Sequence, residues 1–431
     1  MHFQAAPGIY NSAIMNWMKK KSIGGLNIVE ISLVALAVTI PYGDNLNSYT
    51  IVAFAALCLV SSKFDEKVKN LKNQPVLWLL PVLYYVWLCL RLFWDHPVRL
   101  SGEYLESKLS LIAFPLLLGS MNKVSRNAIK RIFFSFVLTN IAASVYCLWK
   151  AYGDYGARRY MGAFFYHNLS SHIGLNAIYF SMYAVFCIFI LVYYFLTERT
   201  SRGTQILTMV SILYLLIIVI LLSSKMFIFL LYLTALCTTA YSYFYFGTIK
   251  PGSAIMFIFL LAIPVLLVKF SFVNARIAQT KLQEYRGTVD DQNGLAVRGV
   301  LWKSSVNLIF ERPVLGWGHS GGEESLRMQL SAAGFEEGAK KNYNSHNQYL
   351  FSWLCFGLPG VILIITFLFT YLVIFIKRRQ FLGIYLAASF ILANITECLI
   401  ETQKGIVFFL FFSTLVMFHF MYQKTGRSVQ G

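Results

Sequence analysis

Side chains that could carry chemistry stand next to long apolar stretches of this sequence, in four groups. The groups are Arg158–Arg159; Ser223–Ser224–Lys225; Arg298 and Trp302 with the stretch Glu311–Gly318 that follows; and Asn344–Leu350, which contains His346, Asn347 and Tyr349. Polar residues at or near membrane depth are costly, so those present are functional candidates. If the groups converge, arginine and lysine can bind a pyrophosphate, and His346 can take a proton from a hydroxyl nucleophile. This combination suits transfer of a glycan from a lipid pyrophosphate carrier to an alcohol.

Each of these residues also has a purely structural interpretation. A single arginine or lysine in an outer loop is most often an interfacial anchor beside lipid phosphates. His346 alone is more often a helix cap or an interface residue than a base, and Trp302 and Tyr349 are most simply aromatic belt residues. Pro313 and Gly316 form a turn that ends a helix whatever the function. The functional interpretation therefore depends on the groups lying together.

Other polar residues give weaker signals. Glu30 and Glu397 lie inside apolar runs, where we expect internal polar contacts, with proton relay as a lesser alternative. His167, His172 and His319 have no partner at a recognisable spacing.

The sequence also lacks the motifs of several other classes. It contains no HExxH, no Asp-rich DxD and no P-loop, which favours catalysis without a metal or other cofactor and argues against ATP-driven transport. The 7 cysteines include no CxxC pair, so neither a disulfide framework nor a cysteine metal site is indicated.

The composition indicates a membrane protein. Of the 431 residues, 57% are hydrophobic and 13% are charged, and the mean hydropathy is +0.60. The net charge of +18 would suggest nucleic acid if it lay on one soluble face, but the lysines and arginines fall mostly in short segments between apolar runs. This pattern indicates membrane topology, and we predict no nucleic-acid partner.

Apolar runs long enough to cross a bilayer predict an all-α polytopic fold with about twelve transmembrane helices. The predicted spans are 26–42, 46–62, 75–94, 106–120, 131–149, 172–197, 204–222, 225–246, 253–270, 348–376, 381–399 and 405–422. The chain then divides into helices one to nine (1–270), a loop with the catalytic candidates (271–347), and helices ten to twelve with a tail (348–431). Within the loop, 296–311 and 321–333 have helical spacing and are separated by Pro313 and Gly316.

Lysine and arginine bias sets the expected orientation. With both termini in the cytoplasm, every predicted inner loop is basic, whereas the opposite loops are richer in acids. The loops 150–171 and 271–347 then lie outside, which in a Gram-negative cell is the periplasm. We therefore predict a multi-pass protein of the bacterial inner membrane with its active side in the periplasm.

The order of the short motifs resembles a known family. An arginine is followed four residues later by tryptophan, then P-x-x-G-x-G, then H-N-x-Y/L before a glycine-containing span. Here these are Arg298 and Trp302; Pro313, Gly316 and Gly318; and His346, Asn347 and Leu350, with Gly357 and Gly360 beyond. With the twelve predicted spans and the late large loop, the pattern resembles the O-antigen ligase and O-antigen polymerase superfamily over nearly the whole chain.

The resemblance implies a GT-C-like fold and roles for particular residues. It gives Arg298 a contact to the donor pyrophosphate and makes His346 the candidate base. The family often has Ser-Arg where this chain has Ser224–Lys225, and lysine keeps the charge but loses the bidentate fork. Further candidates for the pyrophosphate are Arg158 and Arg159, and the supporting candidates are Trp302, Asn347 and Tyr349.

The resemblance also implies the partners, and leaves the acceptor open. The donor is an undecaprenyl-pyrophosphate-linked glycan in the surrounding membrane lipids. The acceptor is lipid A core for a ligase, a second lipid-linked glycan for a polymerase, and a protein Ser/Thr for an oligosaccharyltransferase. The ligase is our preferred interpretation. A flippase or exporter of lipid-linked sugars is the alternative from another class, although its charged residues should run through membrane depth, and here they gather on one side.

Overall fold

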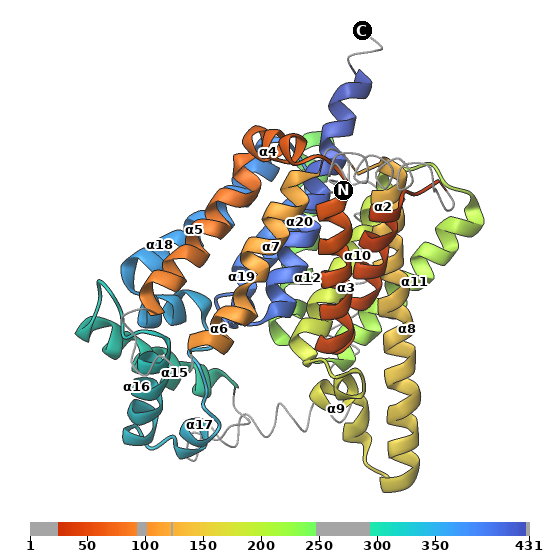
Figure 1. The fold of residues 1–431 in the computed structure, drawn as a ribbon. Coiled ribbons are helices and arrows are strands. Elements are labelled where there is room, and N and C mark those ends of the chain that lie inside the picture. Colours follow the sequence, from red (N-terminus) through yellow and green to blue (C-terminus); the bar gives the residue numbers. More distant parts are fainter. Residues whose placement is uncertain (1–24, 93–100, 122–123, 247–293, 428–431) are drawn as a thin grey trace, which may run out of the picture. The chain divides into compact units, whose positions relative to one another are not determined.

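The computed structural model describes residues 25–92, 101–121, 124–246 and 294–427, and these ranges fold into helices without any β-strand. The expected all-α class is therefore confirmed for the described chain (Figure 1). The predicted span 253–270 and the first part of the predicted loop, 271–293, lie outside the described residues.

Several helices have the length and apolarity of membrane spans. Among the described residues, 5 helices qualify: α5 (Pro75–Leu92), α8 (Arg126–Arg158), α10 (Ala177–Thr197), α11 (Arg202–Leu221) and α18 (Gln348–Lys377). A sixth is added if α3 (Asp44–Val60) and α4 (Phe64–Asn73), which meet at a bend of 106°, count as one span. The described apolar stretches of the other helices, Ile28–Thr39, Lys225–Leu236, Phe381–Ala393 and Gln403–Phe418, are shorter. The membrane character is therefore confirmed, and the count of twelve stays a prediction.

The chain forms two compact units, and the first comprises Met1–Leu79, Ala113–Ser224 and Leu410–Gly431. In it, α2 (Ile28–Thr39) packs on α3 and α8, and α10 packs on α8 and α11. Stacked and tilted rings of Phe133, Phe136 and Phe412 join α8 to the middle of α20 (Gln403–Arg427). Buried aromatic packing of this kind holds apolar helices together without needing polar contacts.

Helix α8 is longer than the predicted span 131–149. It starts at a Ser125 side-chain cap and continues to Arg158, where Arg159 ends it in the left-handed conformation (φ 52). No proline interrupts this stretch, so helical hydrogen bonding continues past the apolar part. The predicted outer loop 150–171 therefore begins as helix, and its remainder carries the short α9 (Tyr166–Ser170) against α8.

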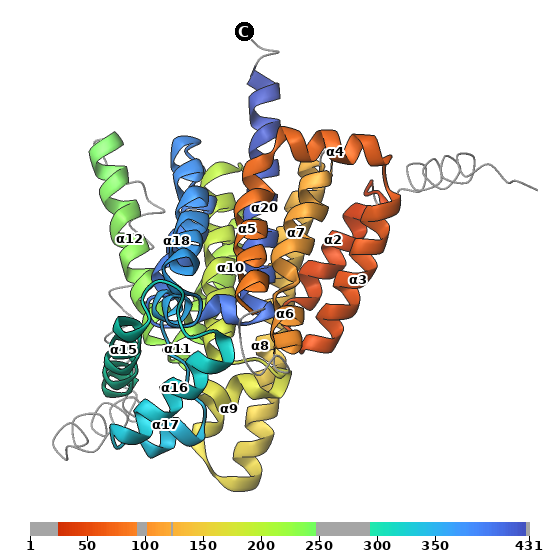
Figure 2. The same cartoon turned by 60° about the vertical axis from the view of Figure 1, so that its left-hand side comes forward.

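The second unit comprises Leu80–Ile112 and Lys225–Phe409. This unit contains most of α5 and the whole of α18. It also contains α6 (Ser101–Lys108), α12 (Lys225–Phe246), α15 (Gly294–Glu311), α16 (His319–Ala332), α17 (Glu336–Lys340) and α19 (Phe381–Ala393). We call α15, α16 and α17 the cap helices, because they gather at the N-terminal end of α18 (Figures 1 and 2). Both helices that the spacing predicted around Pro313 are confirmed.

A break in α18 anchors the cap helices. At Gly357 the backbone leaves the helix (φ 69, ψ −169), which frees backbone groups nearby. The turn 313–318 between α15 and α16 forms hydrogen bonds with these groups. Trp317 N donates to Leu354 O at 2.9 Å, and Gly318 N donates to Cys355 O at 2.8 Å. In return, Leu358 N donates to Val314 O at 3.0 Å. In an apolar environment such backbone pairing is required, so the turn and the break are one structural feature.

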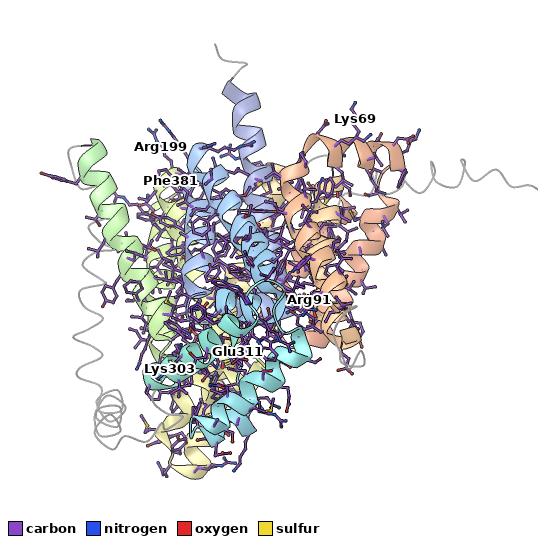
Figure 3. The ribbon with its side chains drawn as sticks, turned by 90° about the vertical axis from the view of Figure 1, so that its left-hand side faces the viewer. Lys69, Arg91, Arg199, Lys303, Glu311 and Phe381 are labelled. Atoms are coloured by element: carbon purple, nitrogen blue, oxygen red, sulfur yellow. The ribbon has the colours of Figure 1, made fainter. Side chains whose placement is uncertain are left out.

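Side chains from α5 and α18 fasten the same turn. Arg91, near the end of α5, donates through Nε to Leu315 O at 2.7 Å and through Nη2 to Gly316 O at 3.0 Å (Figure 3). Trp353 Nε1 donates to Pro313 O at 2.9 Å. The P-x-x-G-x-G sequence thus forms a turn whose carbonyls are held by side chains.

Two predicted spans differ in extent from the structure. The span 106–120 is divided at Leu109 into α6 and α7 (Ser110–Ser120), and the predicted span 381–399 stops being α-helical at Ala393. In both places a charged residue is drawn into a polar contact in the second unit, Lys108 at the end of α6 and Glu397 after α19.

The contact between turn and break predicts that Gly357 cannot carry a side chain. A Cβ there would lie 2.1 Å from Val314 O, in a backbone conformation that is essentially restricted to glycine. We expect Gly357→Ala to lower stability by about 3 kcal/mol or more. Gly299→Ala on α15 is the matched control, because a Cβ at Gly299 meets nothing within 4 Å. Thermal denaturation in detergent, followed by size-exclusion chromatography, measures both, and equal midpoints would contradict the pairing.

Candidate functional site

One carboxylate brings two of the predicted site residues together. Arg298 Nη2 lies 2.5 Å from Glu397 Oε1, and His346 Nδ1 lies 3.5 Å from Glu397 Oε2. Arg298 Nε also donates to the carbonyl of Thr396 at 3.1 Å. We call Arg298, His346 and Glu397 the shared-carboxylate cluster.

Three elements of the second unit position this cluster. Arg298 lies in the second turn of α15, His346 lies two residues before α18, and Glu397 follows the end of α19. His346 itself has a positive φ of 43°, and its N–H donates to the Asn344 side chain at 2.9 Å. This local hydrogen bond, typical of asparagine in turns, holds the imidazole-bearing residue in an otherwise unfavourable backbone conformation.

The side chains differ in their exposure. Glu397 is 10% exposed, whereas Arg298 is 27% and His346 is 33% exposed. The carboxylate therefore lies behind the cation and the imidazole, and both of those reach solvent. A buried carboxylate needs such partners, because burying an unpaired charge is costly.

The supporting candidates hold the start of α18 and its neighbours. Asn347 caps α18, accepting from Tyr349 N at 3.0 Å and Leu350 N at 3.1 Å. The Tyr349 hydroxyl donates to Ile391 O on α19 at 2.9 Å. Both therefore act structurally here. Trp302 lies one turn after Arg298, and its buried indole N–H has no hydrogen-bond partner within the described chain.

A second polar network lies at the other end of the segment 394–401. Lys108 Nζ is 2.9 Å from Glu401 Oε2 and 2.9 Å from the carbonyl of Ile400, and its side chain is only 1% exposed. Gln348 Nε2 donates to Glu401 Oε1 at 2.6 Å, and the Tyr104 hydroxyl donates to Oε2 at 3.0 Å. Burial alone would raise the pKa of Glu401, but the Lys108 ammonium and the Gln348 amide outweigh it and hold that pKa below its usual range. Glu401 is therefore ionised in the folded protein.

The second network extends into α16. The His319 ring stacks on Tyr104 with centroids 3.8 Å apart, and His319 Nε2 lies 3.8 Å from Glu323 Oε2. Burial, reinforced by the charge of Glu401, raises the pKa of Glu323. His319, which had no partner in the sequence, thus gains partners from α6 and from its own helix.

The remaining cationic candidates lie on other elements than the three that position the cluster. Lys225 is the exposed first residue of α12, directly after the buried Ser224. Arg158 and Arg159 are exposed at the end of α8 and belong to the first unit. Their roles toward a donor stay predictions.

Sequence reasoning did not assign Glu397 its central place. It was noted as an acid inside an apolar run, which is the signal that could have found it. Lys108 and Glu401 gave no comparable signal, because their contact joins residues 293 positions apart in the chain. Among the described residues, no cluster of His, Cys, Asp or Glu has the arrangement of a metal site.

Part of this chain is similar to a known protein family. Residues 185–365, which include Arg298 and His346, match the family described as O-antigen ligase. This similarity supports the predicted resemblance to the O-antigen ligase superfamily. Members of this superfamily are glycosyltransferase-like enzymes that act on lipid-linked glycans. The family match ends before Glu397, so that residue and Glu401 enter the site from the adjoining segment.

A relative in Haemophilus influenzae, described as an uncharacterized protein, is 26% identical over 151 residues. The alignment covers 33% of this chain and 37% of the relative, little more than a third of the relative's length.

The buried ion pair predicts a large stability cost for Glu401→Gln. The substitution leaves the Lys108 ammonium buried without its counter-charge, and losing one partner of a buried pair costs about 3–5 kcal/mol. Glu337→Gln is the matched control, because Glu337 pairs with Lys341 at 2.8 Å with both side chains about half exposed. Exposed pairs contribute about 1 kcal/mol or less. Equal denaturation midpoints for the two variants would show that the buried pair does not stabilise the unit.

The lowered pKa of Glu401 predicts an acid dependence of stability. A carboxyl group whose pKa is lower in the folded protein adds stability above its unfolded pKa of about 4.3, and this contribution is lost as the pH falls toward the folded value. The difference in midpoint between wild type and Glu401→Gln should therefore be constant from pH 7 to 5 and shrink below about pH 4. A difference that grows on acidification would contradict the assignment of an ionised Glu401.

Proposed function

We propose that this protein is an O-antigen ligase that transfers a glycan from undecaprenyl pyrophosphate to a sugar hydroxyl of lipid A core. The observation that carries the proposal is that a cation and a partly exposed imidazole, Arg298 and His346, both contact Glu397. Arg298 and His346 lie within the segment that matches the O-antigen ligase family, and Glu397 follows it. A transferase of this kind needs a cation for the departing pyrophosphate and a base for the incoming hydroxyl. The two residues supply both.

The proposed reaction is a single displacement. His346 takes the proton of the acceptor hydroxyl. The hydroxyl oxygen forms a bond to the anomeric carbon of the glycan as the bond from that carbon to the pyrophosphate oxygen breaks. Attack opposite the leaving group inverts the anomeric centre. Negative charge grows on the pyrophosphate in the transition state, and Arg298 stabilises it there. Undecaprenyl pyrophosphate leaves with both electrons of the broken bond, and His346 keeps the proton until it is released to solvent.

Other cations are proposed to help hold the donor. Lys225, Arg158 and Arg159 are candidates on grounds of sequence, and each is exposed in the structure. Trp302, one turn from Arg298, is a further supporting candidate on grounds of sequence. Asn347 and Tyr349 support the site through α18.

The proposed setting is the bacterial inner membrane, with both termini in the cytoplasm and the cluster on the periplasmic side. Lysine and arginine bias of the predicted loops supports this orientation. The donor then enters from the outer leaflet, where its pyrophosphate reaches a group at the membrane surface.

Purified protein in detergent tests the proposal directly. It is incubated with undecaprenyl-pyrophosphate glycan and lipid A core in the presence of EDTA, and we expect glycosylated core to form. Growth of longer lipid-linked chains without added core would identify a polymerase, and transfer to a protein Ser/Thr would identify an O-oligosaccharyltransferase. An untouched donor under all three conditions would refute a transferase and favour an exporter.

Two substitutions test the residue roles. We expect His346→Ala to lower kcat by about 10²–10⁴-fold through loss of the base. We expect Arg298→Lys, which keeps the charge but loses the planar fork, to lower kcat by about 10²-fold or more. Arg327→Ala on α16 is the matched control, since Arg327 pairs with the exposed Glu324 and lies outside the proposed machinery. Full activity of His346→Ala protein would refute the base assignment.

A further inference from the structure

The two oxygens of Glu397 face two different groups that the proposed reaction uses. Oε1 pairs with Arg298 at 2.5 Å, and Oε2 lies at ion-pair distance, 3.5 Å, from His346 Nδ1. Because Glu397 is the most buried of the three, it contacts both from behind and leaves their outer sides to solvent. No role for Glu397 follows from the family match, which ends at residue 365.

We propose that Glu397 is a positioning residue that fixes the imidazole of His346 with Nδ1 inward and Nε2 facing the acceptor. A carboxylate beside Nδ1 favours the tautomer that carries its proton there, which leaves the Nε2 lone pair to accept the hydroxyl proton. If His346 Nδ1 and Glu397 Oε2 move about 0.6 Å closer, their contact becomes a hydrogen bond. Catalytic contacts tighten in this way when substrate binds. The same negative charge stabilises the imidazolium that forms in the reaction. This inference rests on the proposed function.

Glu397 also sets the direction of the Arg298 guanidinium. Its Oε1 and the Thr396 carbonyl engage Nη2 and Nε, so the guanidinium is held by two neighbouring residues of one segment. The carboxylate partly neutralises Arg298, so its removal should not weaken the attraction of the guanidinium for a pyrophosphate. Loss of the Glu397 charge therefore predicts lower kcat without a higher KM for the donor.

The segment that carries Glu397 is itself fixed on both sides. Gln348 N donates to Asn394 O at 2.9 Å, and Leu399 N donates to Asn394 Oδ1 at 3.1 Å. Further along, Ile400 N donates to Gln348 Oε1 at 3.0 Å. A carboxylate on such a braced segment has little freedom to turn away, as a positioning role requires.

The first test reads the tautomer of His346 without any activity assay. Histidine labelled with ¹⁵N is incorporated into the full-length protein, and the signal of His346 among the 7 histidines is identified by its loss in His346→Ala. At a pH well above the ordinary histidine pKa of about 6.5, we expect the Nδ1–H tautomer in wild type and loss of that preference in Glu397→Gln. The same tautomer in both proteins would overturn the proposal.

The second test separates positioning from simple stability. In the transfer assay with donor concentration varied, we expect Glu397→Gln to lower kcat by about 10²-fold or more without raising the donor KM. Glu324→Gln, which breaks an exposed Arg–Glu pair of the same 2.5 Å distance, is the matched control and should leave both constants unchanged. In a His346→Ala background Glu397→Gln should add less than its full loss, because its effect through His346 is already gone and only its effect through Arg298 remains.

The outcomes distinguish this inference from the proposed function. Wild-type protein that transfers no glycan but shows the Glu397-dependent tautomer would refute the ligase and leave the positioning contact intact. Active wild type with unchanged kcat in Glu397→Gln, or with fully additive losses in the double variant, would refute the positioning role and leave the ligase intact.

Discussion

The arrangement of the second unit depends on the need to pair two carboxylates in one short segment. Glu397 and Glu401 are each 10% exposed, and a carboxylate removed from water is tolerated only with charged or hydrogen-bonding partners. Those partners come from separate parts of the chain: Arg298 from α15, His346 and Gln348 from the start of α18, and Lys108 from the end of α6. Satisfying the segment 394–401 therefore draws these elements together at one place.

A second constraint fixes the cap helices on α18. The break at Gly357 leaves backbone groups that must be hydrogen-bonded, and the turn 313–318 meets this need with its own backbone. Because α15 ends directly before that turn, its orientation against α18 follows from the same contacts. Arg298 and His346, one on α15 and one at the start of α18, are then held in a fixed relation by backbone pairing as well as by Glu397.

The helices and the turn of this unit could be predicted from apolar periodicity and motif order in the sequence. The pairing between residues far apart in the chain could not. The helices at 294–311 and 319–332, and the turn at Pro313 and Gly316, follow from local apolar spacing and turn residues. Arg298 and His346 followed from the family motif. Glu397 differs, because an acid in an apolar run signals only that some partner exists. Its partners lie 99 positions away at Arg298 and 51 at His346, a relation that only the fold defines.

Under the proposed roles, the shared-carboxylate cluster does not by itself select the acceptor. Arg298 is proposed to act on the pyrophosphate and His346 on a hydroxyl, and both groups are common to ligases, polymerases and protein O-oligosaccharyltransferases. Glu397 lies behind these two residues, and its proposed positioning role is the same whichever molecule supplies the hydroxyl. Selection among acceptors then belongs to residues that contact the acceptor away from its reacting oxygen. Substitutions in the cluster should consequently change the rate of transfer, and substitutions elsewhere on the exposed side of the cap helices should change which acceptor is used.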